Sequence, residues 1–196
     1  MAARRLPLSA VIVATAVALA AALAVLAVLD GSGDDGASAA GGTTRGYELA
    51  PAGELPGSAA EVRLAPLDGD GPDRALGELL GTKPVVVNFF ASWCVPCVDE
   101  MPAIETVHRS LGDRVTFIGM ANRDTPERAL ATVAATGVTY PTFDDPDASA
   151  LTWFGGLAMP TTVFIDASGE VVDVNSGALT EAELRAKLAE LFGVPT

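Results

Sequence analysis

The chain has 196 residues and a formal net charge of −13, and 49% of its residues are hydrophobic, which gives a mean hydropathy of +0.36. Nucleic acid is excluded as a partner, because phosphate recognition needs clustered basic side chains and the chain has only 12 Lys and Arg residues. Its two cysteines, Cys94 and Cys97, are too few for a disulfide-stapled scaffold or a structural zinc site.

The first predicted element is a membrane-spanning helix over 6–29. These 24 residues carry no charge and make about 36 Å of helix, enough to cross a hydrocarbon layer of about 30 Å. Two arginines precede the run and an aspartate follows it, so we expect residues 1–5 in the cytoplasm and the rest of the chain outside, as in a single-pass cell-membrane protein. The alternative is a signal peptide cleaved near 37–39, which would leave a secreted or periplasmic protein, although such peptides usually have apolar runs of only about 7–15 residues.

Residues 30–46 are predicted to be a flexible linker, because this run is rich in Gly, Ser and other small residues. Residues 47–196 then form the folded domain. Its predicted elements in chain order are a strand over 85–91, a helix from Cys94 to near Gly112 capped by Ser92, a strand over 114–121, a helix over 125–136, strands over 138–143, 161–166 and 170–174, and a last helix opened by the capping box of Thr180 and Glu183. This alternation predicts an α/β fold with a mixed central sheet flanked by helices.

Two cysteines separated by two residues stand at the start of the first of these helices. On a helix their Cα atoms lie about 5–6 Å apart, within the window of about 4.4–6.8 Å that a disulfide allows. Unpaired N–H groups and the helix dipole stabilise a thiolate there, so Cys94 is the predicted nucleophile. Cys97, one turn further, is the predicted resolving thiol. Pro96 fits the first turn, where a missing N–H has no consequence.

Other interpretations of this helix stay open on the residues alone. The cysteines could be half of a metal site or two inert core thiols. The only histidine, His108, is far along the same helix and is expected at its surface, so we predict no metal and no cofactor. Glu100 is either a partly buried acid that exchanges a proton with Cys97 or an acidic residue favoured in an early helical turn.

Several segments together match one known pattern. They are NFFASWCVPC at 88–97, NRD at 122–124, DPD at 145–147 and MPTTVFID at 159–166, with Glu100, Pro102 and Gly169. In these segments the chain resembles the thioredoxin-like TlpA/ResA/CcmG family of membrane-tethered thiol–disulfide oxidoreductases. The resemblance covers roughly 47–196 and implies a thioredoxin-like fold with an extra strand and helix within about 122–154.

The resemblance also implies roles for individual residues. Pro160 would be a cis-proline lying against the cysteine pair, and Met159 would offer its backbone to an extended substrate segment. Glu100 matches the active-site acid of the family, while Asn88 replaces the buried aspartate of thioredoxin, so that proton handling passes to Glu100 or water. The predicted substrate-binding residues are Trp93, Val95, Pro96, Met159 and Pro160.

The predicted function is that of an extracytoplasmic protein-disulfide oxidoreductase that reduces specific disulfides of an exported protein. The proline before Cys97 favours reduction, because strong oxidants often carry a histidine between the two cysteines. By the resemblance, the substrates would be heme-attachment cysteines of apocytochrome c or copper-site cysteines, and an integral-membrane thiol protein would supply the electrons. The alternatives are a Cu(I)-binding chaperone and a general disulfide oxidant. A thiol peroxidase is disfavoured, because it would need Thr or Ser at Ala91.

Overall fold

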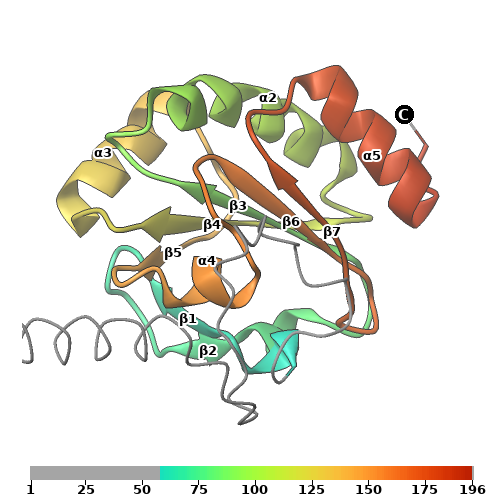
Figure 1. Ribbon diagram of the computed structural model, residues 1–196, viewed down its shortest axis with the longest axis horizontal. Helices are drawn as coiled ribbons and strands as arrows, with labels where there is room; N and C mark the ends of the chain where they lie inside the picture. Colours follow the sequence, from blue (N-terminus) through green and yellow to red (C-terminus); the bar gives the residue numbers. More distant parts are fainter. Residues whose placement is uncertain (1–57, 196) are drawn as a thin grey trace, which may run out of the picture. The chain divides into compact units, whose positions relative to one another are not determined.

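The computed structural model describes residues 58–195, and within them a seven-stranded sheet has helices on both faces (Figure 1). The strands are β1 (Arg63–Pro66), β2 (Arg74–Ala75), β3 (Val85–Phe90), β4 (Thr116–Asn122), β5 (Thr142–Asp145), β6 (Thr161–Ile165) and β7 (Val171–Ser176). The helices are α2 (Val95–Leu111), α3 (Pro126–Thr136), α4 (Ser149–Trp153) and α5 (Glu181–Phe192), with the short 3-10 helices η1 (Ala59–Glu61) and η2 (Leu76–Leu79).

The predictions for the amino-terminal part of the chain lie outside the described residues. These are the cytoplasmic segment 1–5, the membrane helix 6–29, the linker 30–46 and the first residues of the domain. Among the helices between residues 58 and 195, none is both long enough and apolar enough to cross a membrane.

The sheet is mixed, as predicted, and its strand order is β2-β1-β5-β4-β3-β6-β7. The three strands β3, β4 and β5 run parallel, while β6 and β7 run antiparallel to their neighbours. Because carboxyl ends of parallel strands meet at one edge, the loops after β3, β4 and β5 lie together. The cysteines, residues 123–125 and residues 146–148 therefore stand at the same edge of the sheet.

The central strand β3 separates two cores. Its six residues are all buried and their side chains alternate between the two faces. Val86 and Phe90 pack in the core beneath α2 and α5, while Val87 and Phe89 pack in the core on the side of α4. Figure 1 shows α2, α3 and α5 on one side of the sheet and α4 on the other. The start of α2 is thus anchored by a strand that is buried on both faces.

The sequence-based prediction of the cap of α2 was wrong. The helix begins at Val95 and its N-cap is Cys94, not Ser92. The Ser92 hydroxyl donates instead to the carboxylate of Asp124, at 2.9 Å. A hydrogen-bond partner from the loop between β4 and α3 has therefore replaced the local capping bond.

The start of β5 also differs from the prediction, at Thr142 rather than Val138. The N–H and hydroxyl of Thr139 donate to the Glu105 carboxylate, at 2.9 and 2.7 Å, and Pro141 has no N–H to give to a ladder. The other predicted bounds agree with the observed ones within one or two residues. No element was predicted from 47 to 82, because η1, β1, β2 and η2 are too short to show a periodicity.

Candidate active site

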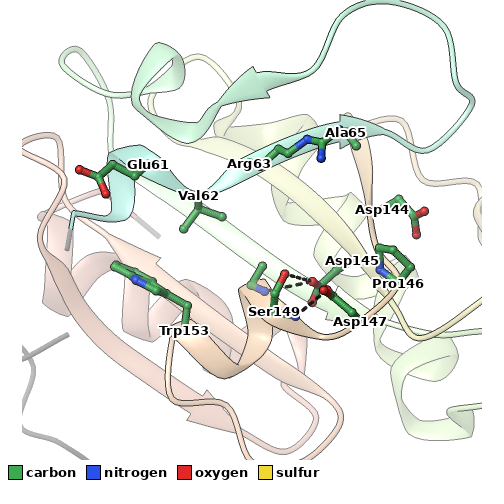
Figure 2. Close-up of a pocket in the computed structure, with 11 residues that line it drawn as sticks. Glu61, Val62, Arg63, Ala65, Asp144, Asp145, Pro146, Asp147, Ser149 and Trp153 are labelled. Atoms are coloured by element: carbon green, nitrogen blue, oxygen red, sulfur yellow. Dashed lines mark hydrogen bonds between the residues drawn. The ribbon is translucent and has the colours of Figure 1, made fainter. Parts of the chain in front are cut away.

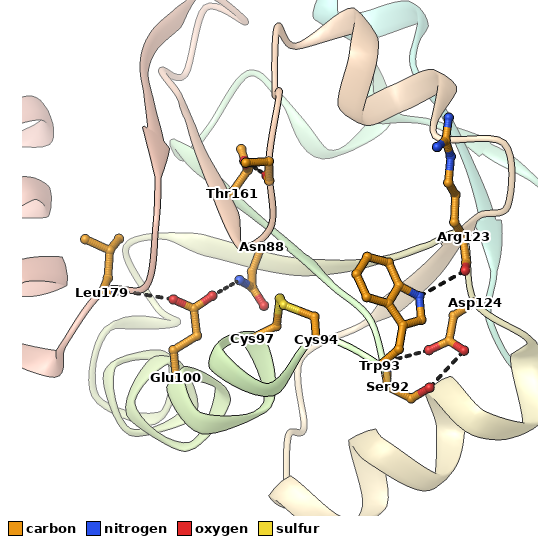
Figure 3. The surroundings of a disulfide bond; sticks show 11 residues. Asn88, Ser92, Trp93, Cys94, Cys97, Glu100, Arg123, Asp124, Thr161 and Leu179 are labelled. Carbon is orange, nitrogen blue, oxygen red and sulfur yellow. Dashed lines mark hydrogen bonds between the residues drawn. A yellow bond between two sulfur atoms is a disulfide. The ribbon is translucent and has the colours of Figure 1, made fainter.

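The two cysteines lie where β3 leads into α2, and they form a disulfide (Figure 3). Their Cα atoms are 5.3 Å apart, as predicted from the spacing. Cys97 is fully buried, whereas Cys94 keeps 5% of its surface exposed. Cys94 is therefore the cysteine that another molecule can reach, which supports its predicted role as the nucleophile.

The start of α2 offers few donors to a thiolate at Cys94. The Cys97 N–H, which a regular helix start leaves without an intrahelical partner, donates to the carbonyl oxygen of Cys94 at 3.1 Å. Pro96, in the first turn, has no N–H. A helix start usually leaves about four N–H groups without an intrahelical partner. Here fewer remain, so the helix start stabilises a Cys94 thiolate less than usual.

Glu100 is buried on the same helix as the cysteines, with 4% of its surface exposed. Its carboxylate accepts hydrogen bonds from Asn88 Nδ2 at 2.8 Å and from the Leu179 N–H at 2.9 Å (Figure 3). Burial raises the pKa of Glu100 from 4.5 to about 7, although these two hydrogen bonds act in the opposite direction. An acid with this pKa gains and loses a proton near neutral pH, as the predicted exchange with Cys97 requires.

The peptide bond between Met159 and Pro160 is cis, as the resemblance implied. Thr161, the next residue, pairs with Phe89 near the end of β3, so Met159 and Pro160 lie at the sheet edge that carries the cysteines. Pro160 is buried and Met159 is half-buried. The Pro160 carbonyl oxygen accepts a hydrogen bond from the Gly177 N–H at 2.9 Å. Substrate binding at Met159 and Pro160 stays a prediction.

Three large apolar side chains are exposed in the described part of the chain, two beside Cys94 at the start of α2 and one in the loop before β6. Trp93 is 54% exposed and Val95 68%, on either side of Cys94, and Leu157 is 62% exposed in the loop before the cis bond. Pro96 is exposed as well. Trp93, Val95 and Pro96 together give the surface beside Cys94 an apolar character. Leu157 was not predicted from the sequence, since a lone apolar residue in a loop has no periodicity that would mark it.

The two residues before Cys94 are held by residues that follow β4. Asp124 accepts hydrogen bonds from the Ser92 N–H at 2.5 Å, the Ser92 hydroxyl at 2.9 Å and the Thr125 N–H at 2.9 Å. The Trp93 indole N–H donates to the Arg123 carbonyl oxygen at 3.1 Å (Figure 3). Arg123 has a positive φ of 48°, which costs energy in a residue other than glycine. This junction fixes both the cysteine loop and the exposed indole.

We expect Asp124→Ala to lower stability by about 1–3 kcal/mol, because it leaves the partly buried Ser92 N–H and hydroxyl without their charged partner. We also expect a lower kcat/KM for disulfide exchange, since the loop before Cys94 loses its anchor. Asp124→Asn keeps one acceptor oxygen and should recover part of both losses. Urea unfolding and exchange kinetics measure them, with Asp113→Ala as the control, because the nearest cation to Asp113 is Arg114 at 3.9 Å. Equal results for Asp124→Ala and Asp113→Ala would contradict the anchoring role.

The expectation for His108 needs correction. Its ring is half-buried and packs edge-on against Phe117 and Tyr140, with centroid distances of 5.5 and 5.6 Å. It is therefore a packing residue of α2 rather than a surface residue. Between residues 58 and 195, the His, Cys, Asp and Glu side chains form no group of three or more that could hold a metal ion.

A pocket of about 560 Å³ lies between β1, β5 and α4 (Figure 2), and neither cysteine lines it. Its lining includes Asp144, Asp145 and Asp147, but none of the predicted site residues. Asp145 is a structural group, because its carboxylate accepts the N–H groups of Ala150 and Leu151 at 3.0 and 3.1 Å. The candidate active site is thus the surface around the disulfide and not this pocket.

Known proteins that are similar to this chain carry the names of thiol-disulfide oxidoreductases and interchange proteins. The Redoxin family model matches residues 50–188. The thiol-disulfide oxidoreductase ResA of Halalkalibacterium halodurans is 33% identical over 134 residues, which are 68% of this chain and 73% of ResA. The thiol:disulfide interchange protein HelX of Rhodobacter capsulatus is 32% identical over 136 residues, 68% of this chain and 74% of HelX. The structure of MTB dsbF aligns with a TM-score of 0.62 at 32% identity, over 68% of this chain and 96% of that one.

Proposed function

The chain belongs to the Redoxin family as a thiol–disulfide oxidoreductase of the TlpA/ResA/CcmG type, and from this we propose that it reduces specific disulfides of exported proteins. One observation carries the proposal: Cys94, the more exposed of the two cysteines, lies between exposed apolar side chains, while Cys97 and Glu100 are buried. This arrangement presents a single reactive sulfur to a partner and keeps the second thiol and a proton acceptor away from water.

The surroundings of Cys94 favour reduction of the substrate over its oxidation. A strong oxidant stabilises its own reduced form, usually through groups that stabilise the first thiolate. Here the residues between the cysteines are Val95 and Pro96, which bring neither a positive charge nor, at Pro96, an N–H donor. A less stabilised thiolate makes the dithiol a better electron donor.

The proposed reaction begins with Cys94 as a thiolate and Cys97 as a thiol. Cys94 Sγ attacks one sulfur of the substrate disulfide, and the other substrate sulfur leaves as a thiolate that takes a proton from solvent. Glu100 then accepts the Cys97 proton, and Cys97 Sγ attacks Cys94 Sγ. The mixed disulfide breaks, the Cys94–Cys97 disulfide forms, and the second substrate thiolate leaves and is protonated at the expense of Glu100. Two electrons have passed from the protein to the substrate.

The proposal extends to location and partners. The uncharged run at 6–29 would hold the domain outside the cell membrane as a single-pass anchor, or would be cleaved to release it. An integral-membrane thiol protein would reduce the Cys94–Cys97 disulfide after each turnover. The resemblance to the TlpA/ResA/CcmG family favours substrates such as the heme-attachment cysteines of apocytochrome c or the cysteines of a copper site.

The reduction potential of the Cys94–Cys97 pair tests the direction. We expect a value in the range of thioredoxin and glutaredoxins, about −270 to −200 mV. Pro96→His should raise it by about 30 mV or more, a tenfold change in the equilibrium constant, because an imidazolium would stabilise the Cys94 thiolate. Pro126→His, at the start of α3, is the matched control and should leave the potential unchanged. A native potential near that of the oxidant DsbA, about −120 mV, would show that the protein oxidises its substrates.

A further inference from the structure

The buried amide of Asn88 hydrogen-bonds through its nitrogen but not through its oxygen. The residue is 1% exposed, and its Nδ2 donates to Glu100 at 2.8 Å. Its Oδ1 is buried and has no hydrogen-bond partner. Buried acceptors without a partner are uncommon in folded proteins, and each calls for a physical reason.

The reason lies in what Glu100 must do. In the carboxylate form, one oxygen accepts from Asn88 Nδ2 and the other from the Leu179 N–H. A proton that lies between either oxygen and its present partner turns that oxygen into a donor that faces another donor. The Leu179 N–H belongs to the backbone and cannot turn. The Asn88 amide can rotate about its last side-chain bond and exchange the positions of Nδ2 and Oδ1.

We propose that Asn88 is a two-position partner of Glu100: Nδ2 donates to the carboxylate, and after the amide turns, Oδ1 accepts from the protonated acid. Both forms of Glu100 then keep two hydrogen bonds inside the core. Asn88 acts through Glu100 and is a positioning residue. The inference rests on the proposed proton exchange between Glu100 and Cys97, and it explains how that exchange can take place away from solvent.

The turned Nδ2 needs an acceptor of its own, and the candidate lies on β6. Thr162 stands directly opposite Asn88 in the antiparallel pairing of β3 and β6, so the two side chains share a face of the sheet. Thr162 is fully buried and its hydroxyl also lacks a hydrogen-bond partner. The structure shows no hydrogen bond between Asn88 Oδ1 and the Thr162 hydroxyl, so the turned Nδ2 reaches this hydroxyl only if the two side chains also move closer together.

Other titratable groups near Glu100 do not explain a turn of the Asn88 amide. Burial, and the charges of Glu100 and Glu105, raise the pKa of Tyr140, which therefore stays neutral. The cations of α5 bind elsewhere, Arg185 to Glu181 and Lys187 to Asp173, and the charged residues of α3 are exposed. On α2, Cys97 is in the disulfide and does not titrate in this form.

The test is a pH titration of the disulfide form by NMR, from about pH 5 to about pH 9, around the pKa of Glu100. The Glu100 carboxyl carbon and the Asn88 side-chain NH₂ group are followed together. We expect both signals to move with one midpoint, because the Asn88 NH₂ exchanges a charged acceptor for a neutral one. A titrating Glu100 beside an unchanging Asn88 would overturn the proposal.

Thr162→Val provides a second, independent readout. The substitution preserves shape and removes only a hydroxyl, and Thr162 makes no hydrogen bond to Glu100 in the structure. If the turned amide uses Thr162, the variant should lower the proton affinity of Glu100 by about fivefold, the value of one neutral hydrogen bond. An unchanged midpoint would overturn the proposal. Neither measurement depends on a substrate, so a reduction potential that refuted the reductase function would leave both results interpretable.

Discussion

Cys97→Ala is expected to hold a substrate as a stable mixed disulfide on Cys94, whereas the native protein releases it. Cys97 is the thiol placed to break that bond, with its Cα 5.3 Å from that of Cys94. Without it, release depends on a thiol from solution, and the lifetime of the complex should rise by several orders of magnitude. Non-reducing electrophoresis and mass spectrometry of the complex with an oxidised two-cysteine peptide measure the trapped fraction.

Cys94→Ser is the matched variant for the order of attack. Its remaining thiol, Cys97, is fully buried and should form no complex, and disulfide exchange should fall by several orders of magnitude because the thiolate nucleophile is gone. Equal trapping by the two variants would show that the roles of the cysteines are assigned wrongly. In cells, the protein captured by Cys97→Ala would identify the substrate, and a variant with Trp93→Ala added should capture less of it.

The predictable part of the site is the part encoded by neighbouring residues. The run of β-branched and aromatic residues before Ser92 predicts β3, and two cysteines one helical turn apart predict the disulfide. Thr180 and Glu183 form the expected capping box at the start of α5. These features depend on contacts within a few residues, which spacing in the sequence describes directly.

The missed part consists of contacts between residues distant in the chain. Ser92 has the chemistry of an N-cap, but Asp124 offers two strong bonds to its N–H and hydroxyl, and a cap offers only one. Glu100 could be read from sequence as an ordinary helical acid until the Leu179 N–H, 79 residues away, is seen to fix it in the core. Such competition between local and distant partners depends on the fold and has no signature in a single sequence.

Glu100→Gln is expected to stabilise the protein above neutral pH while slowing its reaction. The folded pKa of Glu100, about 7, lies above its ordinary value of 4.5, so between these values the folded state binds more protons than the unfolded state. Stability therefore falls by about 3 kcal/mol, the value of this difference in pKa, as pH rises through this window. It stays low at higher pH. Glutamine does not titrate, so this fall should be absent from the variant.

The expected gain in stability above about pH 7 is about 2 kcal/mol. The neutral glutamine amide still accepts from the Leu179 N–H and can donate to the unused Asn88 Oδ1, but the charged hydrogen bonds of the carboxylate are lost. The resolving step should slow by about 10²–10⁴-fold without its proton acceptor. Urea unfolding at acidic and alkaline pH and single-turnover kinetics separate these effects.

Glu105→Gln is the matched control on α2. Burial favours the neutral form of Glu105, but bonds from Thr139 and Arg109 outweigh it and lower its pKa, so its stabilisation is present at neutral pH and lost in acid. This variant should therefore be less stable at neutral pH, and a loss of stability in both variants there would contradict a raised pKa at Glu100.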